Sequence, residues 1–165
     1  MIVITKATEA DLSLIQDMAH QTWPQTFSAI LSLEQIEFML DMMYSQEALK
    51  AQINEKNHVF LLAREGDDYL GYISYELNYQ NEQLTKIHKI YLLPVSQGKG
   101  VGRQLIDTVA NIAVKQANNR LGLNVNRYNK AVQFYERRGF SIIDQQTIDI
   151  GNGFLMDDFV MEKPL

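Results

Sequence analysis

The N-terminal third of the chain places apolar residues at the three- and four-residue spacing of amphipathic helices. Thr8 and Asp11 resemble a capping box, so a first helix is expected from about Thr8 to Thr22, where Pro24 helps to end it. A second helix is predicted after Ser32, and a short third helix follows directly behind it.

From residue 58 the pattern changes to β-rich runs separated by turn residues. Residues 58–65, 69–77 and 84–93 are predicted to form three antiparallel strands. After them come a long helix, a short buried strand at 121–125, a helix at 131–138, and strands at about Ile142–Ile150 and Phe154–Met161. This order predicts one domain over residues 1–165, built on a mixed α/β sheet.

The amino-acid composition limits the kinds of chemistry that the protein can carry out. Apolar residues make up 46% of the chain and charged residues 21%, which is ordinary for a globular protein, and no apolar run reaches the ~20 residues of a membrane helix. The polar N-terminus does not resemble a signal peptide, so a cytoplasmic protein is expected. The absence of cysteine excludes a cysteine acyl-enzyme and a thiolate metal site, and we expect no metal. The net charge of -5 argues against non-specific nucleic-acid binding.

A glycine-rich stretch carries the strongest functional signal. It comprises Gln97, Gly98, Lys99, Gly100, Val101 and Gly102, it follows a predicted strand, and it leads into the long helix through Arg103. Alternating glycines can turn successive N–H groups toward one point at a helix N-terminus, which favours phosphate binding. Lys99 and Arg103 would add positive charge at the rim. Glycines with this spacing can also form only a strand-to-helix turn, and neither the P-loop nor the dinucleotide fingerprint is matched.

The spacing of Gln97, Gly100 and Gly102 resembles the Q/R-x-x-G-x-G/A signature of the GNAT superfamily of N-acetyltransferases. Downstream, NRYNKAVQFYERRGF is similar to the family's N-x-x-A-x-x-F-Y-E-x-x-G-F helix, except that Tyr128 stands where the asparagine is usual and Asn129 follows one place later. The resemblance spans essentially the whole chain. It implies the GNAT fold, a mostly antiparallel mixed sheet whose splayed fourth and fifth strands are flanked by helices.

The resemblance also implies a place for acetyl-CoA as acyl donor. Its pantetheine arm would pair with the backbone of Ile90, Tyr91 and Leu92, and the Leu92 N–H would stabilise the oxyanion. Its pyrophosphate would bind the amides of residues 97–102. Tyr135 matches the family's tyrosine that protonates the leaving thiolate, although a tyrosine here could also serve only in packing. Asn129 is a helix cap and a candidate pantetheine contact.

The acceptor amine must lose a proton, and the sequence offers His88 as a candidate base. Many members of the family carry a glutamate on this strand, at a position that corresponds to Lys86 here. His88 lies two residues further on, which places it on the same face of the strand. A lone strand histidine is, however, more often a packed or surface residue.

The acceptor site of the superfamily is built largely by the first two helices. This segment is similar to that of bacterial spermidine/spermine N-acetyltransferases, which implies a polyamine or another small primary amine. The candidate contacts are Trp23, Phe27, Glu34 and Glu37, with Tyr72 on a neighbouring strand. An amphipathic helix with its acids in water explains the same pattern.

Alternative functions keep the fold. They are a protein or peptide amine acetyltransferase and a non-catalytic acyl-CoA-binding module. The family resemblance also allows a homodimer, although no residue pattern demonstrates one. Intersecting initial-rate plots are expected, because no cysteine can carry the acetyl group and transfer must be direct in a ternary complex.

Overall fold

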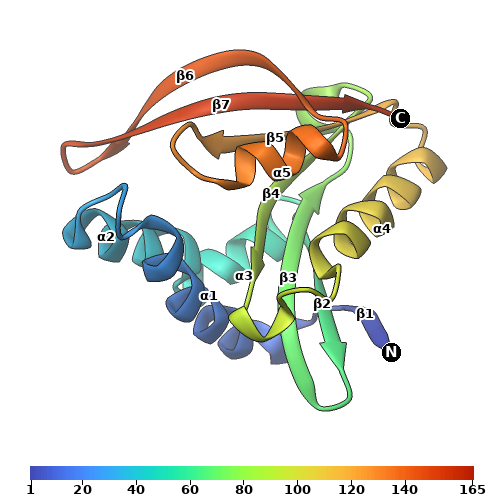
Figure 1. Cartoon of the computed structure of the whole chain (residues 1–165), viewed down its shortest axis with the longest axis horizontal. Coiled ribbons are helices and arrows are strands. Elements are labelled where there is room, and N and C mark those ends of the chain that lie inside the picture. The colour runs from blue at the N-terminus through green and yellow to red at the C-terminus, as the bar shows by residue number, and fades with distance from the viewer.

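A computed structural model of the chain describes residues 1–165 and contains one seven-stranded sheet (Figure 1). The strands are β1 (Ile2–Lys6), β2 (Val59–Glu65), β3 (Asp68–Glu76), β4 (Leu84–Leu92), β5 (Arg120–Asn126), β6 (Ser141–Gly151) and β7 (Phe154–Pro164). They lie in the order β1-β2-β3-β4-β5-β7-β6, and only β4 and β5 run parallel. The mixed, mostly antiparallel sheet expected from the sequence is confirmed.

Helices cover both faces of this sheet (Figure 1). They are α1 (Leu12–Phe27), α2 (Leu33–Tyr44), α3 (Gln46–Asn54), α4 (Val101–Lys115) and α5 (Ala131–Arg137). One core forms between the sheet and α1–α3, and a second forms between the sheet and α4–α5. Alternate residues of β2 serve the two cores: Phe60 and Leu62 face the first, while Leu61 and Ala63 face the second. β2 is therefore apolar on both faces, as a strand buried between two layers requires.

The first helix begins and ends later than the sequence pattern predicts. Thr8 and Asp11 do form a capping box, but it caps a 3-10 turn that precedes α1. The helix then continues through Pro24, because Trp23 and Phe27 are only 1% and 3% exposed and lie in the first core. Burying two large aromatic side chains contributes about 1.5–3 kcal/mol each, which offsets the cost of about 3 kcal/mol for a proline inside a helix.

β1 lies outside the predicted elements, which start at Thr8. It pairs antiparallel with β2, from Ile2 opposite Glu65 to Lys6 opposite Leu61, and forms one edge of the sheet. Five residues are too few for their alternation to stand out in the sequence.

The C-terminal hairpin forms as predicted, although β7 runs on past Met161 to Pro164. Its tip packs on α2. Gln35 Nε2 donates to the Leu155 carbonyl at 2.7 Å, and the Phe38 and Phe154 rings lie 5.4 Å apart. The hairpin therefore bridges from the edge of the sheet to the N-terminal helices.

The fork between β4 and β5 positions the functional site. These strands pair only where Leu84–Ile87 faces Arg120–Leu123. Beyond that point β4 pairs only with β3, and β5 only with β7, so each strand keeps one free edge toward the gap. The splayed fourth and fifth strands that the resemblance implies are confirmed.

Candidate active site

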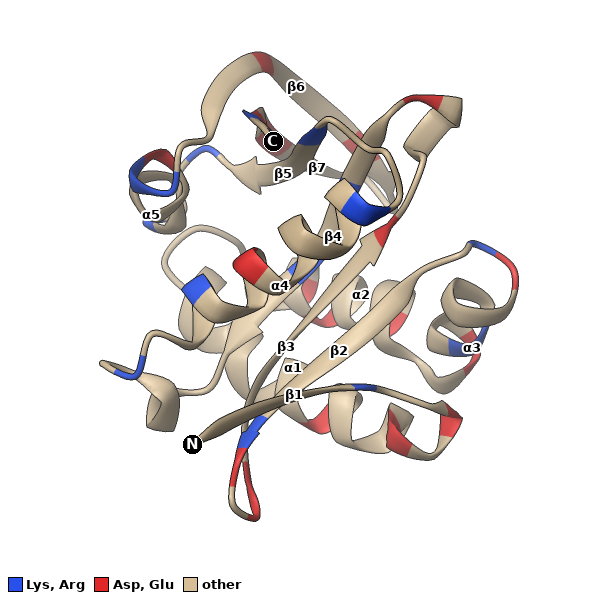
Figure 2. Cartoon of the chain, turned by 90° about the vertical axis from the view of Figure 1, so that its right-hand side faces the viewer, with Lys and Arg blue, Asp and Glu red and all other residues tan.

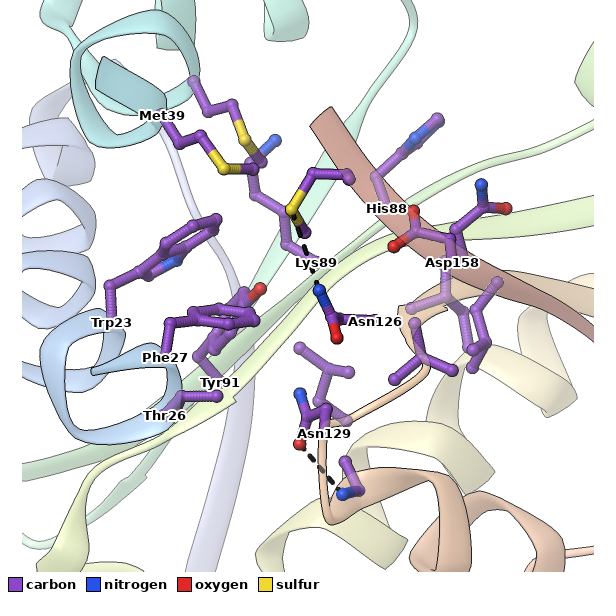
Figure 3. Close-up of a pocket in the computed structure, with 18 of the residues that line it drawn as sticks. Trp23, Thr26, Phe27, Met39, His88, Lys89, Tyr91, Asn126, Asn129 and Asp158 are labelled. Atoms are coloured by element: carbon purple, nitrogen blue, oxygen red, sulfur yellow. Dashed lines mark hydrogen bonds between the residues drawn. The ribbon is translucent and has the colours of Figure 1, made fainter. Parts of the chain in front are cut away.

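A cavity of about 400 Å³ opens where β4 and β5 separate (Figure 3). Residues of α1, α2, β4, β5, α5 and the β6–β7 hairpin line it, and 17 of the 25 lining residues are hydrophobic. Both the volume and the mainly apolar walls are typical of small-molecule sites. Parts of the chain that are far apart in sequence thus meet at the fork.

The glycine-rich loop presents free amides at the N-terminus of α4. The N–H groups of Gln97 and Lys99 donate to the Pro94 and Ser96 carbonyls, so these two amides are not available to a ligand as the sequence analysis expected. The free donors are the N–H groups of Gly98, Gly100, Val101, Gly102 and Arg103, none of which has an acceptor in the chain.

Two glycines of this loop adopt left-handed backbone conformations. Gly98 has φ 77° and Gly100 has φ 70°, and a Cβ at either position would meet nothing within 4 Å. These dihedrals favour glycine, while the open space leaves room for a phosphate. Lys99 Nζ forms an ion pair with Glu65 Oε1 at 2.6 Å, and Arg103 Nε lies 3.8 Å from Asp107 Oδ2.

The end of β4 has a free backbone edge. Leu93 N–H donates to the Leu70 carbonyl at 2.9 Å, on the β3 side. Because successive residues of a strand direct their N–H groups to opposite sides, the Leu92 N–H faces the gap. Ile90, Tyr91 and Leu92 all line the cavity.

Tyr135 and Asn129 reach the cavity from α5 and the turn before it. Tyr135 is 7% exposed and its hydroxyl makes no hydrogen bond within the chain, while burial raises the pKa of that hydroxyl. It therefore stays protonated and can donate to a ligand. Asn129 Oδ1 accepts a hydrogen bond from the Ala131 N–H at 2.9 Å, as expected of a helix cap.

His88 lines the cavity, but its ring is engaged elsewhere. Nε2 lies 3.0 Å from Glu76 Oε1, and the ring stacks on His58 at 3.9 Å. Burial, with the nearby His58 and Lys89, lowers the pKa of His88 to about 3, which makes it a weak base. In Figure 3 the ring extends away from the middle of the cavity. The structure therefore does not favour His88 as the base that the sequence suggested.

The same cluster has the residue types of a metal site. His58, Glu76 and His88 offer three ligand atoms within 4.8 Å of one another. Lys89 and Lys56 act on both histidines electrostatically and would repel a cation. We assign no metal to this cluster.

The predicted acceptor contacts divide into three groups. Trp23 and Phe27 line the cavity and stack at 4.5 Å. Glu34 and Glu37 do not line it and are exposed on α2. Tyr72 is 0% exposed and its hydroxyl donates to Tyr44 Oη at 2.8 Å beneath the cavity wall. The amphipathic pattern of α2 thus reflects a solvated acidic face, and Tyr72 is a core residue.

Two charged residues that line the cavity, Lys89 and Asp158, are not among those predicted from the sequence. Lys89 is 5% exposed and donates from Nζ to Gln52 Oε1 at 2.8 Å, and burial lowers its pKa to about 7. Asp158 lies on β7, outside the family motifs quoted above. Each of the two residues stands among apolar neighbours in its own strand, and this pattern does not indicate that the position lines a cavity.

Comparison with known proteins decides the family. The model of the acetyltransferase (GNAT) domain matches residues 27–162. The chain belongs to the GNAT acetyltransferase family. It is therefore an acetyl-CoA-dependent N-acetyltransferase, as the loop and the Tyr135 helix indicated.

Individual relatives cover nearly the whole chain. This GNAT acetyltransferase is 28% identical to a spermidine N(1)-acetyltransferase of Thermoplasma acidophilum, over 98% of this chain and 96% of the relative. It is 24% identical to an uncharacterized N-acetyltransferase in the pepI 3′ region of Lactobacillus delbrueckii subsp. lactis, over 99% and 98%. Among solved structures, the PaiA N-acetyltransferase of Thermoplasma acidophilum in complex with coenzyme A aligns with a TM-score of 0.83 and 26% identity, covering 100% of this chain and 99% of that one.

Figure 2 shows Lys and Arg as well as Asp and Glu positions on both helices and strands of the ribbon. None of its helices is long and apolar enough to cross a bilayer.

Proposed function

We propose that this enzyme transfers the acetyl group of acetyl-CoA to a primary amine of a small molecule, such as a polyamine, by direct transfer within a ternary complex. One observation carries the proposal: free loop amides, a free strand edge and an unpaired tyrosine hydroxyl surround a single fork that opens into an apolar cavity. The amides suit the pyrophosphate, the edge suits the pantetheine arm, and the cavity suits the acceptor.

In this arrangement the diphosphate of CoA accepts hydrogen bonds from Gly98, Gly100 and the first residues of α4, helped by the helix dipole. Ile90 and Leu92 pair with the pantetheine amides along the free edge of β4, with Asn129 close to the arm, whereas the Tyr91 carbonyl faces Gly71 of β3. The thioester then lies near the Leu92 N–H and the Tyr135 hydroxyl.

The chemistry follows from these positions. The amine attacks the thioester carbonyl, and the Leu92 N–H stabilises the negative oxygen of the tetrahedral intermediate, a contribution of about 3 kcal/mol for one donor. When the C–S bond breaks, Tyr135 donates its proton to the thiolate and regains one from solvent. Absence of cysteine leaves no thiol to hold the acetyl group between the two substrates.

A small amine with an alkyl chain fits the acceptor side of the cavity. Trp23, Phe27 and Tyr91 form an aromatic wall with centroids 4.5–6.5 Å apart, and Met39 and Met43 face the same space. Aromatic faces and thioethers bind alkyl chains and attract ammonium groups. The spermidine acetyltransferase of Thermoplasma acidophilum supports a polyamine as the first acceptor to test.

The test is thiol release from acetyl-CoA with a panel of spermidine, simple alkylamines, amino acids and a peptide with a free N-terminus. We expect turnover with small amines and intersecting lines in two-substrate initial-rate plots. Parallel lines, or acetylated enzyme formed without acceptor, would contradict direct transfer. Preference for the peptide would move the acceptor to proteins, and CoA binding without turnover on any amine would indicate a binding module.

Gly100→Val should weaken CoA binding by about 10–100-fold, because valine disfavours φ 70° and its side chain enters the space proposed for phosphate. Calorimetry of CoA binding measures the effect. Gly153→Val is the matched control: Gly153 has φ 79° and open space as well, but it lies in the β6–β7 turn. If both folded variants bound CoA as the parent does, the loop would not hold the diphosphate.

A further inference from the structure

Asp158 is a buried carboxylate on the wall of the acceptor cavity. It lies on β7, directly opposite Asn126 of β5, and only 8% of it is exposed. Figure 3 shows its carboxylate turned toward the middle of the cavity, whereas the His88 ring extends away from it. Its position on the splayed arm of the fork places it beside the path proposed for the acceptor.

This carboxylate forms no ion pair in the chain, and the Asn124 side chain is its hydrogen-bonding neighbour. Oδ1 is buried without a hydrogen bond, and no cationic side chain lies within the 4.0 Å of an ion pair. Asp158 is also the single aspartate or glutamate among the 25 residues that line the cavity. A buried carboxylate with an unsatisfied oxygen and no ion pair destabilises the fold, so its presence at a ligand site favours a ligand that carries a cationic group.

The surroundings of Asp158 favour proton exchange. Burial raises its pKa, and Asp157 acts in the same direction, while the Asn124 amide and Lys86 act in the opposite one. Tyr91 faces it from β4. Lys86 Nζ donates to Asn124 Oδ1 and forms no ion pair with Asp158, so Lys86 favours the charged carboxylate only through its electrostatic field.

We propose that Asp158 binds the ammonium group of the acceptor and takes one proton from it before the amine attacks the thioester. The inference deepens the proposed function and rests on it. Asp158 therefore takes the role of general base that the sequence suggested for His88.

The proton balance closes with Asp158 in this role. The ammonium group transfers one proton to the carboxylate, and the neutral amine forms the new C–N bond. As the C–S bond breaks, the thiolate receives a proton from Tyr135, and the amide nitrogen loses its second proton. Asp158 and Tyr135 then return to their starting states by exchange with solvent, with one proton released per turnover.

The experiment compares Asp158→Asn with the parent enzyme, using acetyl-CoA and the best amine of the panel. We expect kcat/KM to fall by about 10²–10⁴, because asparagine keeps the shape and cannot accept the proton. The acidic limb of the pH profile should disappear in the variant. CoA affinity, measured by calorimetry, should stay within about threefold of the parent.

Asp157→Asn is the matched control. Asp157 is the preceding residue of β7, its Oδ1 accepts a hydrogen bond from Thr147 at 2.8 Å, and it does not line the cavity. This variant should keep the turnover of the parent and an acidic limb in the pH profile, which moves only to a lower pH because the Asp157 charge no longer helps to raise the Asp158 pKa. An Asp158→Asn enzyme with parental kcat/KM would overturn the proposal.

Failure of the proposed function would be recognised separately. If the parent acetylated no amine of the panel, calorimetry of spermidine and alkylamine binding to the CoA-loaded protein would decide the role of Asp158. Binding that weakens at least tenfold in Asp158→Asn and not in Asp157→Asn supports an ammonium site at Asp158. Equal binding by both variants, or no binding by the parent, overturns it.

Folding stability distinguishes this role from a structural one. When folding raises the pKa of a carboxyl group, the protein loses stability as the pH rises from the unfolded pKa of about 3.9 through the higher folded pKa. Asp158→Asn should therefore unfold at the same temperature as the parent at pH 7, or at a higher one. A lower unfolding temperature would show that the aspartate is needed for the fold.

Discussion

Tyr135→Phe is expected to lower turnover by about 10²–10⁴ while the protein folds and binds CoA as before. The hydroxyl makes no hydrogen bond within the chain, so its removal breaks none, and phenylalanine fills the same space. Burial raises the pKa of this hydroxyl, so it stays protonated across the assay range and remains ready to donate. The loss should appear in kcat rather than in KM, under conditions where chemistry limits the rate.

Tyr75→Phe provides the control for Tyr135. Tyr75 is 5% exposed, belongs to the same core, and also has a pKa raised by burial, but it does not line the cavity. The two variants should differ in turnover by the whole effect of the catalytic hydroxyl. If both kept parental turnover, Tyr135 would be only a packing residue.

The part of the site proposed for the acyl donor could be predicted from the sequence because its elements are local. The free amides lie within a few residues at the start of α4, and Tyr135 and Asn129 belong to one short helix and its cap. Here neighbouring positions in sequence are neighbours in space, so spacing alone indicates the geometry.

The part of the cavity proposed for the acceptor could not be predicted from the sequence, because it depends on how the strands pair. Asp158 meets the cavity through pairing of β7 with β5, and Lys89 through its position at the fork of β4. Sequence pattern shows that both positions lie in strands, but not which strand lies beside them. Glu34 and Glu37 show the opposite case. They were predicted to contact the acceptor, but they lie on an acidic face of α2 that points to solvent.

The position at which α1 ends also depends on tertiary contacts. Pro24 marks a helix end by local rules, yet α1 continues to Phe27 because two aromatic residues around the proline are buried. Packing outweighs local preference at that point.

Trp23→Ala is expected to lower the free energy of unfolding by about 3–5 kcal/mol. Trp23 is 1% exposed and its ring contacts Phe27, Tyr44 and Tyr91 at centroid distances of 4.5, 6.1 and 5.6 Å. Alanine leaves a void at the point where α1, α2 and β4 meet. Denaturant unfolding followed by far-UV circular dichroism measures the change, since Trp23 is the only tryptophan and its fluorescence is lost in the variant.

Two further substitutions separate packing from acceptor binding at Trp23. Tyr128→Ala, at an aromatic residue that is 64% exposed, should change stability by no more than about 0.5 kcal/mol. Trp23→Phe keeps an aromatic ring on the cavity wall, so it should recover part of the stability and leave CoA affinity unchanged. Because the ring also lines the cavity proposed for the acceptor, we expect the KM for the amine to rise in Trp23→Phe while kcat changes little. Stability within 1 kcal/mol of the parent in Trp23→Ala would show that the helices do not depend on this ring.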